Sequence, residues 1–574
     1  MHTTVIRGGT IVDGTGRPAF TGDVALDGDR IVQVGGKAGP GRREINADGL
    51  LVTPGWVDVH THYDGQATWD PELSPSSWHG VTTVLFGNCG VGFAPVRREH
   101  REELVRLMEG VEEIPGIVLA EGLKWNWESF PDYLDALAAI PRAIDVGAQV
   151  PHHPLRVYVM GERAIRREKA TAEDIAEMSR LTEQALRAGA FGFTTSRTNS
   201  HKTPDGEMVP GRYSEVEELL GIGRALGRVG HGAFGMNSDF DIEIEELEWL
   251  TRLGKETGRP VWFLLTDRPT DTERWQRLLE GVRRARAEGA MVTAQVAGRP
   301  VGVLLGADTA LNPFSIRPSY QALLKLPIEE RMKRLRDPAV RAQVLSEAPS
   351  EELVSRLSQF RQHITRRWHR MFILGDPPDY EPRASESIAA IAEREGRTPD
   401  EVAYDYLAGG ADRFLFFPVT GYNVDNHDVI HEMLTNEATL LGLSDGGAHC
   451  SSIIDASMPS FMLTHWTRDR SRGPRLPLEF VVKRQTSEPA AFYGLNDRGV
   501  LAPGKKADVN ILDYAGLRLH APEVRYDLPA GGRRLVQRVD GYKATFASGV
   551  PIFEDGEFTG ALPGKLVRAG RVAA

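Results

Sequence analysis

The fold is decided by one stretch, residues 53–64, which reads Thr53-Pro54-Gly55-Trp56-Val57-Asp58-Val59-His60-Thr61-His62-Tyr63-Asp64. An apolar run leads directly into His60 and His62. Residues i and i+2 of a β-strand point to the same side, so the two imidazoles can converge on one ion. In barrels of parallel strands, active sites lie at the carboxyl ends of the strands. The stretch therefore predicts a metal site at the end of the first strand of such a barrel.

The chain beyond this stretch alternates short apolar runs with amphipathic segments such as 173–188 and 215–226. This alternation is typical of parallel β/α units. We therefore predict an α/β fold with a TIM-like (β/α)8 barrel over residues 56–494. The candidate barrel strands are Gly55–His60, Thr82–Phe86, Asp145–Val150, Phe191–Thr195, Gly232–Asn237, Pro260–Thr266, Met291–Val296 and Thr439–Ser444.

Both chain ends consist of short β-branched runs separated by tight turns. The first 55 residues contain Gly8-Gly9, Asp13-Gly14 and Asp27-Gly28 between such runs, which is a hairpin signal. The segment after about residue 495 has the same texture. We expect residues 1–55 and 495–574 to form one small β-sandwich domain beside the barrel.

The gap before the last candidate strand is unusually long. Residues 310–420 include the charged, helix-compatible runs Arg331–Arg336 and Arg366–Arg370. Long insertions at the catalytic end of a barrel are often lids, but a solvated helical excursion would have the same composition. We predict a helical insertion here, which is either a lid over the site or a solvated helical excursion.

The composition narrows the class of protein. The chain has 574 residues, 41% of them hydrophobic, and a net charge of −11. The mild acidity argues against a nucleic acid or an anionic membrane as partner, so we expect a small-molecule substrate. An assembly of identical copies is compatible with these properties.

The location of the protein is also suggested by what the sequence contains. Two cysteines are too few for a disulfide framework. The N-terminus lacks the basic start and apolar run of a signal peptide, and no stretch reaches the roughly 18 apolar residues of a membrane span. A soluble cytoplasmic protein is expected.

Two further residues are candidates for the metal site. Cys89 lies between glycines at the end of the second candidate strand, and a thiolate is a strong zinc ligand; alternatively it is an inert buried thiol. Asp445 ends the strand that would close the barrel beside the first. A carboxylate there can bind a metal and take a proton from its water, whereas the alternative is a plain Asp-Gly turn.

Other polar residues are candidates for substrate contacts. Those near strand ends either contact substrate or only begin a loop, and those near the insertion are possible anion clamps. They are His152, His153, His201, Lys202, Arg299, Arg317, Tyr320 and His449.

Taken together, these motifs resemble the amidohydrolase superfamily, and within it the N-acyl-D-amino-acid deacylases, or D-aminoacylases. The resemblance runs nearly end to end, and the Asn-Cys-Gly element is the part that points to the D-aminoacylase branch. It rests on residues 8–16, 53–64, 87–90, 188–196, 444–446 and 497–508.

The resemblance implies a zinc ion held by His60, His62, Cys89 and Asp445. It also implies hydrolysis of a linear amide bond, in an N-acyl D-amino acid or a related N-acylated amine. In such enzymes the metal activates a water molecule, and the aspartate, here Asp445, shuttles its proton to the leaving amine.

One departure from the family affects the metal count. Members place a histidine at the end of the fifth strand and another at the end of the sixth. The corresponding stretches here, 234–239 and 262–267, contain none, although Asp239 and Asp267 could offer oxygen ligands. We expect one zinc ion, with two as the alternative. Rival functions are a cyclic-amide or ester hydrolase of the same superfamily, or a non-catalytic scaffold relative.

Overall fold

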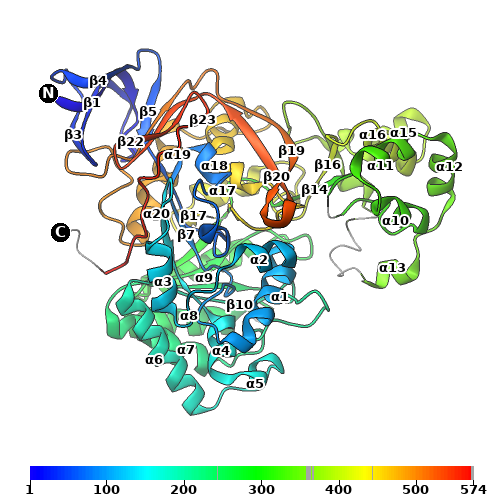
Figure 1. Cartoon of the computed structure of the whole chain (residues 1–574), viewed down its shortest axis with the longest axis horizontal. Helices are drawn as coiled ribbons and strands as arrows, with labels where there is room; N and C mark the ends of the chain where they lie inside the picture. Colours follow the sequence, from blue (N-terminus) through cyan, green and yellow to red (C-terminus); the bar gives the residue numbers. More distant parts are fainter. Residues whose placement is uncertain (242, 310, 357–363, 365–366, 443, 571–574) are drawn as a thin grey trace.

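The computed structural model in Figure 1 describes residues 1–241, 243–309, 311–356, 364, 367–442 and 444–570. Its parallel strands confirm the α/β class. Parts of three expectations lie outside the described residues: Leu443 of the last candidate strand, Arg366 of the second charged run, and positions 310, 357–363 and 365 of the insertion.

All eight predicted strand segments contain parallel strands. β6, β7 and β8 pair in one sheet, and β9 to β13 with β17 pair in another. Gln149 separates β8 from β9 within the third segment. The strands are β6 (Trp56–Asp58), β7 (Val81–Phe86), β8 (Asp145–Ala148), β9 (Val150–Pro151), β10 (Gly192–Arg197), β11 (Ala233–Ser238), β12 (Val261–Leu264), β13 (Val292–Val296) and β17 (Thr439–Leu441).

The segments that follow the first and the last of these strands are joined to each other. Thr61 forms a parallel bridge with Gly446. The His62 N–H donates to the Gly446 carbonyl at 2.7 Å, and the Asp445 N–H donates to the His60 carbonyl at 3.1 Å. These bonds bring the two ends of the parallel strand series together.

Helices between the strands follow the predicted amphipathic pattern. They include α6 (Ala172–Ala188), α7 (Val216–Val229), α8 (Glu243–Thr257) and α9 (Arg274–Ala287). In α6, Thr171 and Asp174 form a capping box at the start, and Gly189 ends the helix with φ 116°. The helix buries Met178, Ala185 and Leu186, so its apolar stripe faces the core.

The two chain ends share one mixed β-sheet. β5 pairs antiparallel with β18, which places Val52 opposite Ile511. Within the described chain the order is β23-β22-β21-β18-β5-β1-β2-β3, with β4 beside β1. Strands from both chain ends lie together at the upper left of Figure 1. The strands are β1 (His2–Ile11), β2 (Phe20–Asp27), β3 (Arg30–Val34), β4 (Gly41–Asn46), β5 (Leu51–Pro54), β18 (Val509–Leu512), β21 (Tyr542–Ala547), β22 (Val550–Glu554) and β23 (Glu557–Phe558). A separate hairpin joins β19 (Arg518–Leu528) to β20 (Gly532–Asp540).

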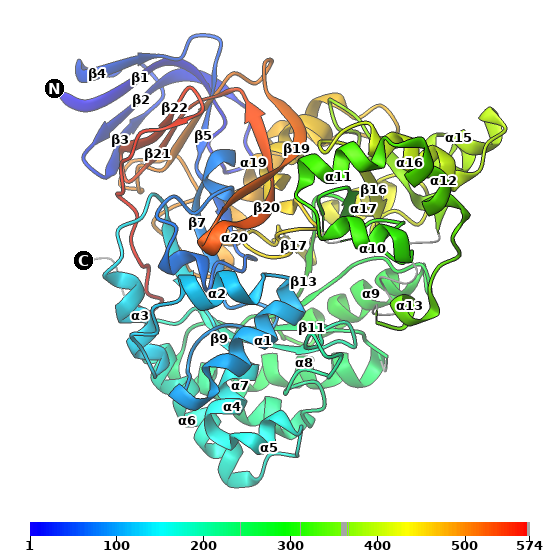
Figure 2. The same ribbon diagram turned by 45° about the vertical axis from the view of Figure 1, so that its right-hand side comes forward.

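The predicted helical insertion also contains strands at its base. It projects to one side of the molecule in Figures 1 and 2 and has a core of its own, which includes Leu305, Phe314 and Tyr404. β14 and β15 both pair with β16 in an antiparallel sheet. The elements are β14 (Gly302–Gly306), α10 (Pro318–Leu324), α11 (Ile328–Leu335), α12 (Pro338–Ser346), α13 (Glu351–Arg356), β15 (Phe372–Leu374), α15 (Ile388–Glu395), α16 (Pro399–Ala408) and β16 (Phe414–Pro418). The insertion therefore has short strands beside the predicted helices, because these apolar runs find partners only after a long loop has folded back.

Among the helices that the structure describes, none is long and apolar enough to span a membrane.

A buried ion cluster fixes the returning C-terminal segment to the parallel strands. Asp145, the first residue of β8, accepts from Arg498 Nη1 at 2.6 Å and from Lys506 Nζ at 2.6 Å. Burial alone would raise the pKa of Asp145, but the two cations lower it below its ordinary value. The carboxylate is thus the anionic centre of the cluster.

We predict that Asp145→Asn lowers the free energy of unfolding by about 3–5 kcal/mol, because it leaves two buried cations without their shared anion. Urea unfolding of the purified variant would measure the loss.

Asp135→Asn is the matched control, since the Asp135 side chain is 76% exposed and pairs only with Arg568 at the surface. Because the pKa of Asp145 is depressed, its contribution should be present above its unfolded pKa of about 4 and be lost as the pH falls. A variant as stable as wild type at pH 7 would contradict the assignment.

Candidate metal centre

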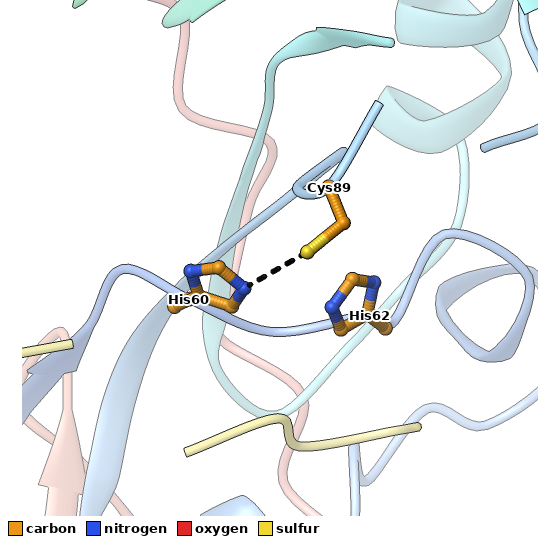
Figure 3. Close-up of side chains that lie close together, drawn as sticks. All are labelled: His60, His62 and Cys89. Atoms are coloured by element: carbon orange, nitrogen blue, oxygen red, sulfur yellow. Dashed lines mark hydrogen bonds between the residues drawn. The ribbon is translucent and has the colours of Figure 1, made fainter. Parts of the chain in front are cut away.

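The two histidines of the opening motif lie just beyond the end of β6. Both are fully buried. Figure 3 shows the Cys89 thiol directed toward the space between their rings, with Sγ 3.7 Å from His60 Nε2. One ligand atom from each of His60, His62 and Cys89 lies within 4.8 Å of the other two. His60 and His62 therefore point to the same side, as the alternation of side chains along a strand predicts.

Cys89 is held in place by its neighbour Asn88. Asn88 Nδ2 donates to the carbonyls of Thr61 at 3.1 Å and Leu85 at 3.2 Å, and its Oδ1 accepts from Gln149 Nε2 at 2.8 Å. One buried amide thus ties the ends of the first three strand segments together. Cys89 has φ 53°, a left-handed conformation that turns its side chain into the site.

Asp445 completes the group from the last strand. Its Oδ1 lies 3.6 Å from His60 Nε2 and 3.6 Å from His62 Nε2. The residue has φ 50°, and the preceding Ser444 donates its hydroxyl to the buried Asp58. The carboxylate therefore faces both imidazoles through the contact that joins the first and last segments.

Several separations in this group are close to those of a tetrahedral cation site. Ligand bonds typical of zinc would separate two nitrogen or oxygen ligands by about 3.3 Å, and a nitrogen from a sulfur by about 3.6 Å. Asp445 lies 3.6 Å from each histidine, and Cys89 lies 3.7 Å from His60. The ligand atoms that lie within 4.8 Å of one another are those of His60, His62 and Cys89, so the Asp445 carboxylate approaches the histidines but is not in this mutually close set. Two imidazoles and a thiol are thus arranged to hold a metal ion, and the carboxylate stands beside them.

The far nitrogens of both imidazoles lie close to an amide or a carboxylate. His60 Nδ1 lies 2.6 Å from Gln295 Oε1, an atom that only accepts, so Nδ1 carries the proton and Nε2 is free to bind. Such a partner fixes the ring orientation of a metal-binding histidine. His62 Nδ1 lies 3.3 Å from Glu112 Oε1 but makes no hydrogen bond within the described residues.

Burial and the neighbouring charges set the protonation of the group. Burial lowers the pKa of His60 to about 4 and raises the pKa of the Cys89 thiol well above its ordinary value. Burial alone would raise the pKa of Asp445, but the His62 and His60 imidazoles lower it to about 2. Asp445 is therefore an anion, while the thiol has to lose its proton when a cation binds.

Two of the predicted substrate-contact residues lie close to this group. His449 is placed between Glu112 at 3.7 Å and Glu113 at 3.6 Å. Burial opposes its charge, but these carboxylates raise the pKa of His449 to about 9, so the ring is a cation at neutral pH. Burial, together with His449 and His62, lowers the pKa of His201 to about 3, so this ring is neutral.

His153 also faces the loop that carries Cys89. Its backbone N–H donates to the Gly90 carbonyl at 2.9 Å. Its Nδ1 accepts from the Gly211 N–H at 3.1 Å, so Nε2 carries the proton, and this buried atom has no hydrogen-bond partner in the described structure.

The other candidates have partners elsewhere. His152 bonds Thr195 and Glu218, and Arg299 is buried against Asp455. Arg317 donates to Asp400, and Tyr320 accepts from Asn312, both inside the insertion's own core. The backbone of Lys202 bridges to Met208 in the loop after β10. The structure does not bring these five residues together with the histidines and Cys89.

Several site residues were not identified from the sequence. Glu112 ends α1 (Arg101–Glu112), Gln295 lies on β13, and Asn237 at the end of β11 lies 3.4 Å from His201 Nε2 and interacts with the Cys89 thiol. Only Asn88 had a local signal, since it precedes Cys89 in the Asn-Cys-Gly element. The others reach the site through tertiary packing alone.

The two aspartates that could have replaced the missing histidines are already engaged. Asp239 accepts from Thr198 Oγ1 at 2.7 Å, from the Asn199 N–H at 2.6 Å and from Arg268 at 3.0 Å. Asp267 accepts from Asn423 Nδ2 at 2.9 Å and from the Gly421 N–H. Their oxygens therefore serve loop structure.

Comparison with known proteins shows the family to which this chain belongs. The model of the Amidohydrolase family matches residues 43–553, and the chain belongs to this family. The D-aminoacylase of Alcaligenes xylosoxydans xylosoxydans is 26% identical over 569 residues, which cover 98% of this chain and 97% of the relative. The N-acyl-D-aspartate deacylase of the same organism is 29% identical over 575 residues, which cover 99% of this chain and 95% of the relative. The expected resemblance to D-aminoacylases is confirmed.

The fold is shared with solved structures of this group. The N-acyl-D-glutamate deacylase from Bordetella bronchiseptica, complexed with zinc and a phosphonate inhibitor, has a TM-score of 0.63 at 23% identity. The likeness covers 99% of this chain and all of the other. It shows that the chain has the fold of that deacylase.

We predict that Cys89→Ala weakens metal binding at least tenfold, because it removes a thiolate ligand. Elemental analysis after dialysis against a metal buffer would measure the occupancy.

Cys450→Ala is the matched control, since Cys450 is also buried but its thiol donates to the Gly447 carbonyl. It should keep the wild-type metal content. Equal occupancy in both variants would show that Cys89 is only a core residue.

Proposed function

We propose that this protein is a metal-dependent hydrolase that cleaves a linear amide bond, with an N-acyl D-amino acid as its substrate class. The observation that carries the proposal is the buried cluster of His60, His62 and Cys89, with the Asp445 carboxylate 3.6 Å from both histidines. The names of the full-length relatives, a D-aminoacylase and an N-acyl-D-aspartate deacylase, support the choice of substrate.

We propose one zinc ion as the cofactor, bound by these four side chains. A thiolate among the ligands favours zinc over magnesium or calcium, which prefer oxygen. The single ion is supported by Asn237, Asp239 and Asp267, a neutral amide and two engaged carboxylates at the ends of β11 and β12, where the family resemblance leads us to expect histidines.

The mechanism assigns the proton transfers to Asp445. A bound divalent cation supplies a Lewis acid that polarises the amide carbonyl and makes water a stronger acid. The Asp445 carboxylate accepts a proton from the attacking water and donates it to the leaving nitrogen, so the amide bond breaks as the carboxylic acid forms. Its low pKa keeps it anionic at neutral pH.

Two histidines are proposed to contact the substrate. His449 is cationic at neutral pH and lies on the Asp445 loop, where it can face the carboxylate of an amino acid. His153 Nε2–H is a buried donor without a partner in the described structure, close to Gly90 beside Cys89, and can bond an acyl oxygen.

The same proposal covers the architecture around the site. We propose that the parallel strands form one closed (β/α)8 barrel over residues 56–494. Residues 1–55 and 495–574 form the accessory β domain, and residues 310–420 form the insertion. The bridge between Thr61 and Gly446 and the pairing of β5 with β18 support these assignments.

We predict that Asp445→Asn reduces kcat by about 10²–10⁴-fold, because an amide cannot accept the proton from water. Steady-state hydrolysis of N-acetyl-D-amino acids would measure it. Asp469→Asn is the control, since that side chain is 51% exposed on the surface. Wild-type rates in Asp445→Asn would refute the proton-transfer role.

The substrate class is tested with a panel of amides. We expect hydrolysis of N-acetyl-D-amino acids to exceed that of the L-enantiomers at equal concentration. Activity only on cyclic amides would favour the cyclic-amide hydrolase alternative. A purified protein that holds no metal would favour a scaffold.

A further inference from the structure

Another cluster of possible metal ligands lies outside the proposed catalytic group. It consists of Glu381, His427 and His465. Glu381 lies in the loop after β15, His427 precedes α17 (Asp428–Thr435), and His465 lies in the π-helix η7 (Met462–Asp469). Glu381 is 3% exposed, His427 is fully buried, and the side chain of His465 is 14% exposed. Three segments far apart in the sequence therefore place ligand-type side chains at one buried point.

The separations in this cluster match those of a metal-bound set. His427 Nδ1 lies 3.0 Å from His465 Nε2, and Glu381 Oε2 lies 3.3 Å from His465 Nε2 and 3.9 Å from His427 Nδ1. These values surround the edge of about 3.3 Å expected for nitrogen and oxygen ligands of tetrahedral zinc. Two histidines and one glutamate are also a common three-residue ligand set for zinc.

The proton pattern directs a lone pair of His427 into the cluster. His427 Nε2 lies 2.9 Å from the Tyr380 carbonyl, which only accepts, so Nε2 carries the proton. The Nδ1 lone pair then accepts the hydrogen bond from His465 Nε2, and a cation would take the place of that proton. The backbone N–H of His427 donates to Glu381 Oε1 at 2.7 Å, while Oε2 faces the two rings. A carbonyl behind the histidine and an N–H behind the carboxylate are typical of the surroundings of metal ligands.

Arg470 is the main argument for a plain salt-bridge network instead. It donates to Glu381 Oε2 at 3.2 Å and to Oε1 at 3.1 Å, and it also pairs with Asp428 at 2.7 Å. Asp428 is 48% exposed, so Glu381 is the buried carboxylate of this network. Each carboxylate oxygen has two lone pairs, so Oε2 can accept from Arg470 and still bind an ion.

The backbone at His465 is also unusual. The Arg470 N–H donates to the His465 carbonyl at 2.9 Å, an i to i+5 bond that defines a π-turn. Such turns are rare and occur frequently at functional sites. Here the π-turn lies where His465 stacks on Phe461, with ring centroids 4.6 Å apart and planes inclined by 14°.

We propose that Glu381, His427 and His465 bind a zinc ion that is distinct from the catalytic one and that braces the insertion. The ion would join the loop that leaves β15 to the helix before β17 and to the π-helix after it. β17 leads to Asp445, so the brace lies beside the strand that supplies the proposed proton shuttle. The fourth position is left for water, since the His465 side is the exposed side of the cluster.

The test begins with the double variant His60→Ala/Cys89→Ala, which removes two of the four proposed catalytic ligands. Cobalt titrated into this metal-free variant should still bind one equivalent and give tetrahedral d–d absorption without a sulfur-to-cobalt charge-transfer band. Adding His465→Gln should abolish that absorption. If the double variant binds no cobalt with tetrahedral absorption, the site does not exist. Absorption that survives His465→Gln would place the ion elsewhere and also overturn the proposal.

The single variants supply an independent readout. His465→Gln and His427→Gln should each lose one metal equivalent relative to wild type while keeping the sulfur-to-cobalt band of the catalytic site. His431→Gln is the control, because His431 also packs near Trp466, with ring centroids 5.9 Å apart, and is not part of the cluster. Wild-type metal content in His465→Gln, with circular dichroism showing a native fold, would leave only the salt-bridge network. The titration of His60→Ala/Cys89→Ala leaves the cluster intact, so absence of tetrahedral cobalt absorption there would overturn the proposal even if the cluster variants fail to fold.

Discussion

The reciprocal backbone bonds between residues 60–62 and 445–446 are the contact on which the rest of the site depends. His62 donates to Gly446 and Asp445 donates to His60, so the segments after the first and last parallel strands are fixed in register. Two short bonds therefore set the distance from the Asp445 carboxylate to both imidazoles. Asn88 does the same for the second strand, because one amide bonds the carbonyls of Thr61 and Leu85. Backbone pairing, rather than side-chain flexibility, prepares the geometry for a cation.

Without a bound cation, burial of these carboxylates lowers the stability of the fold. Asp445 and Glu112 lie within a buried site, where an uncompensated carboxylate is strongly destabilising. His449 supplies one positive charge to them, and a divalent cation would supply the larger share. The same electrostatic requirement explains why the Asp145 carboxylate, at the start of β8, is bonded by two cations, Arg498 and Lys506. Buried charge in this protein is found where opposite charge meets it.

The two ligand clusters differ in how the chain builds them. The catalytic donors come from the ends of parallel strands, where every strand delivers its side chains to the same edge. Glu381, His427 and His465 come instead from a loop, a helix start and a π-turn around the insertion. A cation in each position would do different work: one would act on substrate, and the other would hold an insertion with its own core against the strand that carries Asp445.

The sequence by itself determined the features that rest on local periodicity. His60 and His62 share a face because strand side chains alternate, and the strand and turn patterns predicted the α/β class, the parallel segments and the pairing of the chain ends. The family motifs added Cys89 and Asp445 as candidates.

Tertiary structure alone decided which distant residues meet. Glu112, Gln295 and the Glu381 cluster have no local signal, and Arg317 and Tyr320 proved to belong to the insertion's own packing. The strands β14 and β16 were also missed, because each is a short apolar run whose partner lies more than a hundred residues away. The physical reason is the same in each case: side-chain period and turn chemistry act over a few residues, whereas a site or a sheet edge is assembled only when the whole core packs.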